Sequence, residues 1–272
     1  MRVRVAAVVL SLACAFGAPA TVRADGARVV DVPTRAGVTE RILYLTPAQP
    51  KAAAILIPGG DGDIEIHPNG RVSFGGNFLV RSRDRFVQNG LAVAVLDAPS
   101  DRRSPPYLGG GFRQTPQHVD DLRAVIAWMR AETHLPVWLI GTSRGTQSAA
   151  YFATQVSQPR DGGADGIVLT STILVGANAQ DRAVPQMPLA NIDVPVLVVH
   201  HRSDGCRLCP FGDIARFMAL LSTPPHSQLI AVDGGTDIGD PCEAQAYHGF
   251  NGIESGVVKL IADWIAAEDA RR

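Results

Sequence analysis

The sequence lacks several features, and each absence disfavours a class of protein. Its 272 residues carry a formal net charge of −1 and its arginines are scattered, so no basic patch points to nucleic-acid binding. Beyond the N-terminus, no apolar run is long enough to span a membrane. No internal repeat, low-complexity tract or linker divides the chain. What is present, 46% hydrophobic and 19% charged residues, is typical of one globular domain with a sizeable core.

The N-terminus differs from the rest of the chain and has the pattern of a secretory signal peptide. Two arginines precede an apolar stretch over residues 5–16, and an A-x-A sequence at residues 18–20 offers a cleavage site, with residues 22–24 as an alternative. We therefore predict a signal peptide over residues 1–24 and a single mature domain over residues 25–272. The mature protein is expected to be secreted or periplasmic.

The mature chain alternates short apolar runs with amphipathic segments. Two N-terminal strands are expected to pair antiparallel at one edge of a sheet, and the later strands alternate with helices, which predicts a mostly parallel α/β sheet covered on both faces. Such sheets place their functional residues at the carboxyl ends of the strands. The expected strands are 28–32, 39–45, 52–57, 91–96, 135–140, 166–170, 194–200 and 227–232, and the expected helices are 77–89, one that begins with Thr115 as N-cap and Pro116 as its first residue, 146–156, 211–221 and 253–267.

A G-x-S-x-G motif lies between one of these strands and the helix that follows. It reads Gly141-Thr142-Ser143-Arg144-Gly145, and a sharp strand-to-helix turn of this kind exposes the serine hydroxyl above the sheet. Gly141 and Gly145 leave room where strand and helix approach most closely. The amide of Arg144, at the helix N-terminus, would face an oxyanion formed on an attacked carbonyl. We predict that Ser143 is a nucleophile; the alternative is a Gly-Ser turn without chemistry.

A second glycine-rich turn, Pro58-Gly59-Gly60-Asp61-Gly62, follows the apolar strand at residues 52–57. No Gly-Lys-Ser/Thr comes after it, which disfavours a phosphate-binding loop. With Ser143 as nucleophile, this turn is the natural source of a second oxyanion donor, the amide of Gly60 or of Asp61.

A serine nucleophile needs a base, and a carboxylate to orient that base. Of the seven histidines, His248 lies in a glycine-flanked loop between the last strand and the last helix. Asp204 follows the strand at residues 194–200, at the same predicted edge of the sheet. We therefore predict a Ser143, Asp204 and His248 triad. The reserve acids, all after the last strand, are Asp233, Asp237 and Asp240.

These residues give the chain a resemblance to the α/β-hydrolase superfamily, in particular to its serine esterase and lipase-like members of the secreted bacterial type. The motif around Ser143 is similar to the nucleophile elbow of that family, and the order serine, acid, histidine is the family's order. Pro58-Gly59-Gly60 stands where many members have His-Gly-Gly. The resemblance implies the α/β-hydrolase fold and hydrolysis of an ester, thioester, amide or related acyl bond without a cofactor.

The cysteines take on a meaning once the triad is assigned. Export leaves three of them, Cys206, Cys209 and Cys242, so at most one internal bridge can form. A Cys206–Cys242 disulfide would tie the loop of Asp204 to the loop of His248. Cys209 is the competing partner, and Cys206-Arg207-Leu208-Cys209 is also a C-x-x-C, which leaves a redox motif open; for a zinc site a second ligand pair is not found.

The leading hypothesis is a serine hydrolase that cleaves carboxylic esters through an acyl-enzyme, with a small-molecule acyl compound as substrate and no metal. A serine peptidase on the same triad, or a non-catalytic binding protein on a hydrolase scaffold, is the alternative. Two irregular regions, residues 98–114 and 171–191, are expected to shape the substrate cleft, the second as a small lid.

Overall fold

The structure is a computed structural model that describes residues 25–156, 158–176, 181–221 and 226–272. Within these ranges the chain forms an eight-stranded sheet of order β1-β2-β4-β3-β5-β6-β7-β8. β1 and β2 pair antiparallel at one edge, β2 is antiparallel to β4, and the remaining neighbours are parallel. The strands are β1 (Asp25–Pro33), β2 (Thr39–Thr46), β3 (Ala52–Ile57), β4 (Leu91–Leu96), β5 (Val137–Thr142), β6 (Gly166–Thr170), β7 (Val196–His201) and β8 (Ser227–Val232).

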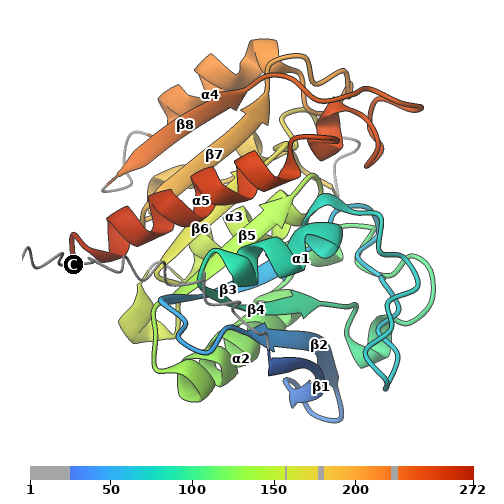
Figure 1. Cartoon of the computed structure of the whole chain (residues 1–272), viewed down its shortest axis with the longest axis vertical. Coiled ribbons are helices and arrows are strands. Elements are labelled where there is room, and N and C mark those ends of the chain that lie inside the picture. The colour runs from blue at the N-terminus through green and yellow to red at the C-terminus, as the bar shows by residue number, and fades with distance from the viewer. Residues whose placement is uncertain (1–24, 157, 177–180, 222–225) are drawn as a thin grey trace, which may run out of the picture.

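Helices cover the sheet on both faces (Figure 1). On one face lie α1 (Phe78–Gln88) and α5 (Glu254–Asp269), side by side, and on the other lie α2 (Pro116–Thr133), α3 (Gly145–Gln155) and α4 (Ile214–Leu220). The apolar side chains form two large clusters accordingly, one under α1 and α5 and one under the other three helices. The central strands β3, β4 and β5 are buried at every residue, which explains why they are continuous apolar runs.

The predicted element order is confirmed, and the differences lie at element ends. Thr115 is the N-cap of α2, with its hydroxyl oxygen accepting from the His118 amide and Pro116 as first residue, as predicted. The predicted strand at 135–140 begins only at Val137, because Pro136 has no N–H to donate to a neighbouring strand. The predicted helix over 211–221 is wrong in its first turn: Phe211–Asp213 form a 3-10 turn, in which Gly212 disfavours the α-helix, and α4 begins at Ile214.

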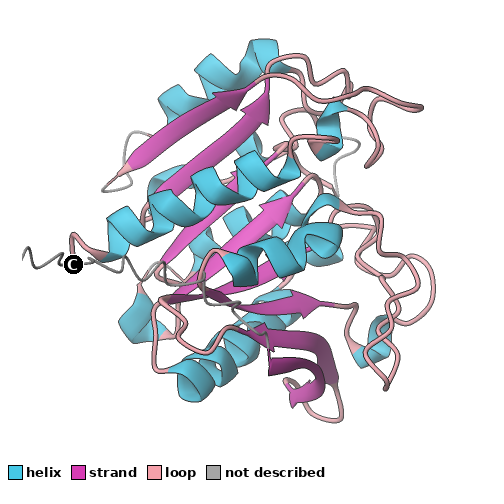
Figure 2. Cartoon of the chain, in the orientation of Figure 1, coloured by secondary structure: helices cyan, strands magenta, loops and turns pink. Residues whose placement is uncertain are grey.

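The parallel strands end at one edge of the sheet, and long loops gather there (Figure 2). The loops after β3, β5 and β7 and the loop between β8 and α5 all lie at this edge, so the topology brings together the predicted site residues. The predicted signal peptide lies outside the described residues. Among the described residues, every helix is too short or too polar to cross a membrane.

Candidate active site

The turn between β5 and α3 holds Ser143 in a strained conformation. Its φ angle is +51°, in the left-handed region that residues with a side chain seldom adopt. The two flanking glycines have no room for a side chain: a Cβ at Gly141 would lie 2.3 Å from the Gly145 carbonyl oxygen, and a Cβ at Gly145 would lie 2.2 Å from the Ile57 carbonyl oxygen. The close approach of β3, β5 and α3 therefore forces the turn that presents Ser143.

Asp204 and His248 meet although they are far apart in the chain. The Asp204 carboxylate follows β7, His248 lies in the loop between β8 and α5, and His248 Nδ1 is 3.0 Å from Asp204 Oδ2. Both side chains are buried. Because a carboxylate only accepts hydrogen bonds, Nδ1 carries the hydrogen and donates a hydrogen bond to Asp204. The arrangement leaves the lone pair of Nε2 available as a base.

The second ring nitrogen of His248 belongs to a residue that lines the same cleft as Ser143. Nε2 is buried and has no hydrogen-bond partner among the described residues, and His248 and Ser143 form parts of the wall of the same cleft. No hydrogen bond joins Nε2 to the Ser143 hydroxyl in the described residues. Such bonds are often long in the absence of substrate and shorten when it binds.

Asp204 is fixed by more contacts than the sequence indicated. Its Oδ1 accepts a hydrogen bond from the Cys206 amide at 2.9 Å. His200 Nε2 lies 3.5 Å from its Oδ2 and donates to the Cys209 carbonyl oxygen at 2.9 Å. Burial lowers the pKa of His200, so its ring is neutral at neutral pH. The carboxylate therefore has a second imidazole beside it, which no local pattern in the sequence predicted.

The cysteines form the disulfide that the triad suggested. Cys206 and Cys242 are bonded, with a sequence separation of 36, and the bond joins the loop of Asp204 to the loop of His248. Cys209 keeps a free, buried thiol, which donates to the Ser171 carbonyl oxygen at 3.3 Å.

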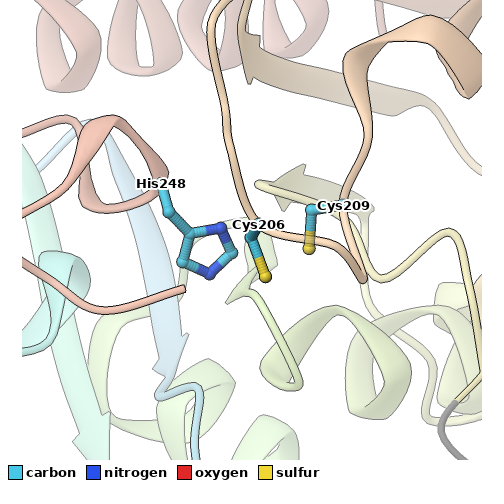
Figure 3. Close-up of side chains that lie close together, drawn as sticks. All are labelled: Cys206, Cys209 and His248. Carbon is cyan, nitrogen blue, oxygen red and sulfur yellow. The ribbon is translucent and has the colours of Figure 1, made fainter. Parts of the chain in front are cut away.

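One group of described side chains has the donor types of a metal site. Ligand atoms of Cys206, Cys209 and His248 lie within 4.8 Å of one another, and Figure 3 shows the His248 ring beside the two cysteines. Cysteine binds metals as the thiolate. The sulfur of Cys206 is held in the disulfide, and burial raises the pKa of the Cys209 thiol well above its usual value. The donor set therefore fits a disulfide with a neighbouring thiol better than a metal centre.

Other carboxylates singled out in the sequence have different partners. Each of the three reserve acids has a partner outside the proposed triad. Asp233 pairs with Arg202, Asp237 accepts from the Tyr247 amide, and Asp240 accepts from the Cys242 amide. Asp97, at the end of β4, accepts hydrogen bonds from the amides of Ile64, Ile66 and Ala98. It therefore anchors the loop after β3 as well as capping its own turn.

The two predicted oxyanion donors lie in the wall of the same cleft. The amides of Gly60, Asp61 and Arg144 donate no backbone hydrogen bond to another described residue, so all three are available to a ligand. Beneath the loop after β3 lies a buried arginine, Arg113, whose Nη2 is 3.1 Å from the Pro58 carbonyl oxygen and 3.2 Å from that of Gly60. Sequence reasoning missed Arg113, which stands in an irregular segment without a motif.

The cleft has a volume of about 780 Å³. Ser143 and His248 contribute to its wall, together with the loops after β3 and β7 and the segment before α1. In that last segment Phe74 is 59% exposed, and Gly75 and Gly76 line the cleft without a side chain. The space is large enough for a small organic molecule.

No model of a known protein family matches the chain, and no curated protein matches it in sequence. Solved structures do. A dienelactone hydrolase from Anabaena variabilis matches over 88% of this chain and 96% of its own, with a TM-score of 0.61 and 15% identity. An esterase from Pyrococcus furiosus matches over 88% and 90%, with a TM-score of 0.64 and 12% identity.

A cold-adapted esterase from an Arctic intertidal metagenomic library is also similar. It matches over 93% of this chain and 99% of its own, with a TM-score of 0.56 and 16% identity. The three matches cover 88% to 93% of this chain. The chain therefore has the α/β-hydrolase fold, as the resemblance in its sequence predicted.

Proposed function

We propose that the protein is a serine hydrolase that cleaves a carboxylic ester of a small molecule through an acyl-enzyme. The observation that carries the proposal is the buried hydrogen bond between His248 and Asp204, which leaves Nε2 unpartnered in the cleft that also holds Ser143. The strained turn at Ser143 supports it. Solved structures of the same fold that are named as esterases add support for an ester as substrate.

In the first half of the reaction Ser143 attacks the ester carbonyl. His248 Nε2 takes the hydroxyl proton as Ser143 Oγ bonds to the carbonyl carbon, and the positive charge on the ring is stabilised by Asp204. The carbonyl oxygen becomes an oxyanion, which accepts hydrogen bonds from the amides of Gly60 and Arg144. The intermediate then collapses, and His248 gives its proton to the departing alcohol oxygen.

The second half releases the acid. A water molecule loses a proton to His248 Nε2 and attacks the acyl carbon, which forms a second oxyanion at the same amides. Cleavage of the bond to Ser143 Oγ, with return of the proton from His248, yields the carboxylic acid and the free enzyme. Each role belongs to a residue of this chain, and no cofactor enters any step.

Substitution of Ser143 by alanine tests the proposal. We expect Ser143→Ala to lose hydrolysis of p-nitrophenyl acetate and butyrate and labelling by a fluorophosphonate, while its unfolding transition stays close to that of the wild type. Ser203→Ala, at an exposed serine in the loop after β7, is the matched control and should keep full activity. Turnover retained by Ser143→Ala would falsify the proposal, as would absence of turnover and labelling in the wild type.

Peptide substrates in the same assay separate the two enzymatic alternatives. Cleavage of p-nitroanilide peptides faster than of the esters would replace the esterase by a peptidase on the same residues. A wild-type protein that binds acyl compounds but reacts with neither substrate nor fluorophosphonate would be a binding protein.

We also infer that the protein acts outside the cytoplasm. The Cys206–Cys242 disulfide supports this, because such bonds persist in oxidising compartments. Expression of the full chain in a Gram-negative host should place activity in the osmotic-shock fraction, and a chain that starts at residue 25 should stay in the cytoplasmic fraction.

A further inference from the structure

We propose that Arg113 is a positioning residue for the oxyanion hole: its guanidinium, buried beneath the loop after β3 and bonded to α3, aligns the amides of that loop with the amide of Arg144. This role rests on the proposed function and deepens it. It concerns a side chain that touches no substrate and acts only through the backbone it binds.

The contacts of Arg113 connect the two sources of oxyanion donors. Nη2 donates to the carbonyl oxygens of Pro58 and Gly60, at 3.1 Å and 3.2 Å, and Nη1 donates to the Ser148 hydroxyl at 2.9 Å. Pro58 and Gly60 belong to the loop after β3, and Ser148 lies on α3, the helix that begins two residues after Ser143. One rigid, planar guanidinium therefore sets the distance between loop and helix.

These bonds fix the direction of the loop amides. The peptide bonds of the loop are trans, so each carbonyl points away from the N–H of the next residue. Arg113 binds the carbonyls of Pro58 and Gly60, and the Gly62 amide binds the carbonyl of Gly59 at 3.2 Å. Arg113 thereby holds the peptide planes of the Gly59 and Asp61 amides directly, and the plane of the Gly60 amide, which lies between them, is held by the bond from Gly62.

Charge strengthens the effect. The three hydrogen-bond acceptors of Arg113 are neutral, and the carboxylates of Asp181 and Asp61 also stabilise its positive charge. Burial lowers the pKa of Arg113 to about 10, which leaves it charged at neutral pH. A cation bound to a carbonyl oxygen polarises that peptide group and makes its N–H a stronger donor.

The Arg113 side chain is closely packed. Arg113 is 2% exposed, and a Cβ at Gly62 would lie 2.8 Å from Nη2. The Ser148 hydroxyl is also 2.9 Å from His118 Nε2. Burial lowers the pKa of His118 to about 3, so its ring is neutral at neutral pH, and the Ser148 hydroxyl that accepts from Arg113 has this ring as its second partner.

The test compares Arg113→Met and Arg113→Lys with the wild type on p-nitrophenyl butyrate, with rates divided by the fraction of protein that a fluorophosphonate labels. We expect kcat per labelled site to fall by ~10- to 100-fold in Arg113→Met, with KM within ~3-fold of wild type, because the interaction lost is made in the transition state. The Ki of a trifluoromethyl ketone, which forms a tetrahedral oxyanion adduct, should rise by the same factor as kcat falls.

Arg113→Lys should show a smaller loss, because an ammonium keeps the charge but cannot span both carbonyls and Ser148. Arg130→Met is the matched control: Arg130 also binds a backbone carbonyl, that of Gly163, but at the opposite end of the sheet. It should leave kcat per labelled site unchanged. Amide hydrogen exchange in residues 58–62 should speed up in the Arg113 variants and not in the control.

The outcomes separate the two proposals. Wild-type kcat and ketone affinity in folded Arg113→Met or Arg113→Lys overturn the role of Arg113 and leave the proposed function intact. A loss confined to KM or to the labelled fraction also overturns it, since a purely structural defect would act there. A wild-type protein that does not hydrolyse esters and does not react with the fluorophosphonate overturns the proposed function, and this role with it.

Discussion

The elbow at residues 141–145 and the pair of loops that carry Asp204 and His248 solve the same problem in different ways. The elbow is five consecutive residues packed between two strands and a helix, and a Cβ at Gly141 or Gly145 would lie only 2.3 Å or 2.2 Å from a backbone carbonyl oxygen. The acid and base lie 44 residues apart, on loops joined by a disulfide. Sterics position Ser143, the proposed nucleophile, and the disulfide brings together the loops of Asp204 and His248.

The two halves of the site are therefore sensitive to different substitutions. The conformation of the elbow changes only if the backbone of the core moves, because the elbow packs against β3 and β5. The two loops have little regular structure of their own, so their relative position depends on a few identifiable bonds. Four substitutions, taken from the largest expected effect to the smallest, test this contrast.

Gly145→Ala should break the elbow. The new methyl group would lie 2.2 Å from the Ile57 carbonyl oxygen, a contact that only backbone movement relieves, and we expect a loss of ~5 kcal/mol in the free energy of unfolding. Urea unfolding measures it. Gly256→Ala is the control, since a Cβ there meets nothing within 4 Å and a helical alanine should stabilise by ~0.5–1 kcal/mol. Equal stabilities would contradict the steric account.

Removal of the disulfide should destabilise the two loops that carry Asp204 and His248. Cys206→Ala with Cys242→Ala opens a loop with a sequence separation of 36, and loop entropy predicts a loss of ~4 kcal/mol. The kcat for esters should also fall by ~10-fold, because the Asp204–His248 pair is less well positioned. Urea unfolding and ester kinetics with and without dithiothreitol measure both effects. Cys209→Ala keeps the bond and is the control; a double variant as stable as this control contradicts the prediction.

Low pH should destabilise the protein through His118, near the elbow. His118 is hydrogen-bonded to Ser148 on α3. Its folded pKa of about 3 lies below its usual 6.5, so the unfolded chain binds the proton first. Stability is then fully present above pH 6.5 and is lost as pH falls toward 3. Between pH 7 and 4.5 the wild type should lose ~2.5 kcal/mol more than His118→Gln. Parallel losses in urea unfolding would show that the buried histidine is not the cause.

A weaker tether should give the smallest effect. Arg81 Nη2 on α1 donates to the Gly249 carbonyl oxygen, next to His248, at 2.6 Å, and the same side chain pairs with Glu254. Arg81→Met should therefore cost only ~1–2 kcal/mol in unfolding free energy and lower the kcat by less than the disulfide variant does. A loss larger than that of the disulfide variant would mean that this hydrogen bond, and not the cross-link, positions the base.

The same contrast explains what the sequence could predict. The elbow was predictable because its strand, motif and helix are contiguous, and the strands because β3, β4 and β5 are buried at every residue. The acid and base were inferred from chain order and loop position, and their hydrogen bond appears in the structure. Their catalytic roles stay predictions, since no hydrogen bond joins His248 Nε2 to Ser143 among the described residues.

Other parts of the site left no trace in any local pattern. The partners of Arg113 are 35 to 55 residues away, and a single arginine in an irregular segment has no periodicity to reveal them. His200 lies beside Asp204 because the chain turns after β7, and that turn is not visible in the sequence pattern. In the expected lid at 171–191 the described residues form loops and two 3-10 turns, and among them Ile173 alone lines the cleft; residues 177–180 lie outside the described structure. The expectation that residues 98–114 form a wall of the cleft is wrong, because the residues that line it come from other loops.

Gly75 and Gly76 form a part of the cleft wall without side chains, and substitutions there would change the substrate range of the proposed hydrolase. A methyl group added at either residue meets no atom within 4 Å, and both residues face the cleft. Larger side chains introduced there would narrow the space in front of Ser143 while the catalytic framework stays as it is. Selectivity can thus be altered at this wall independently of catalysis.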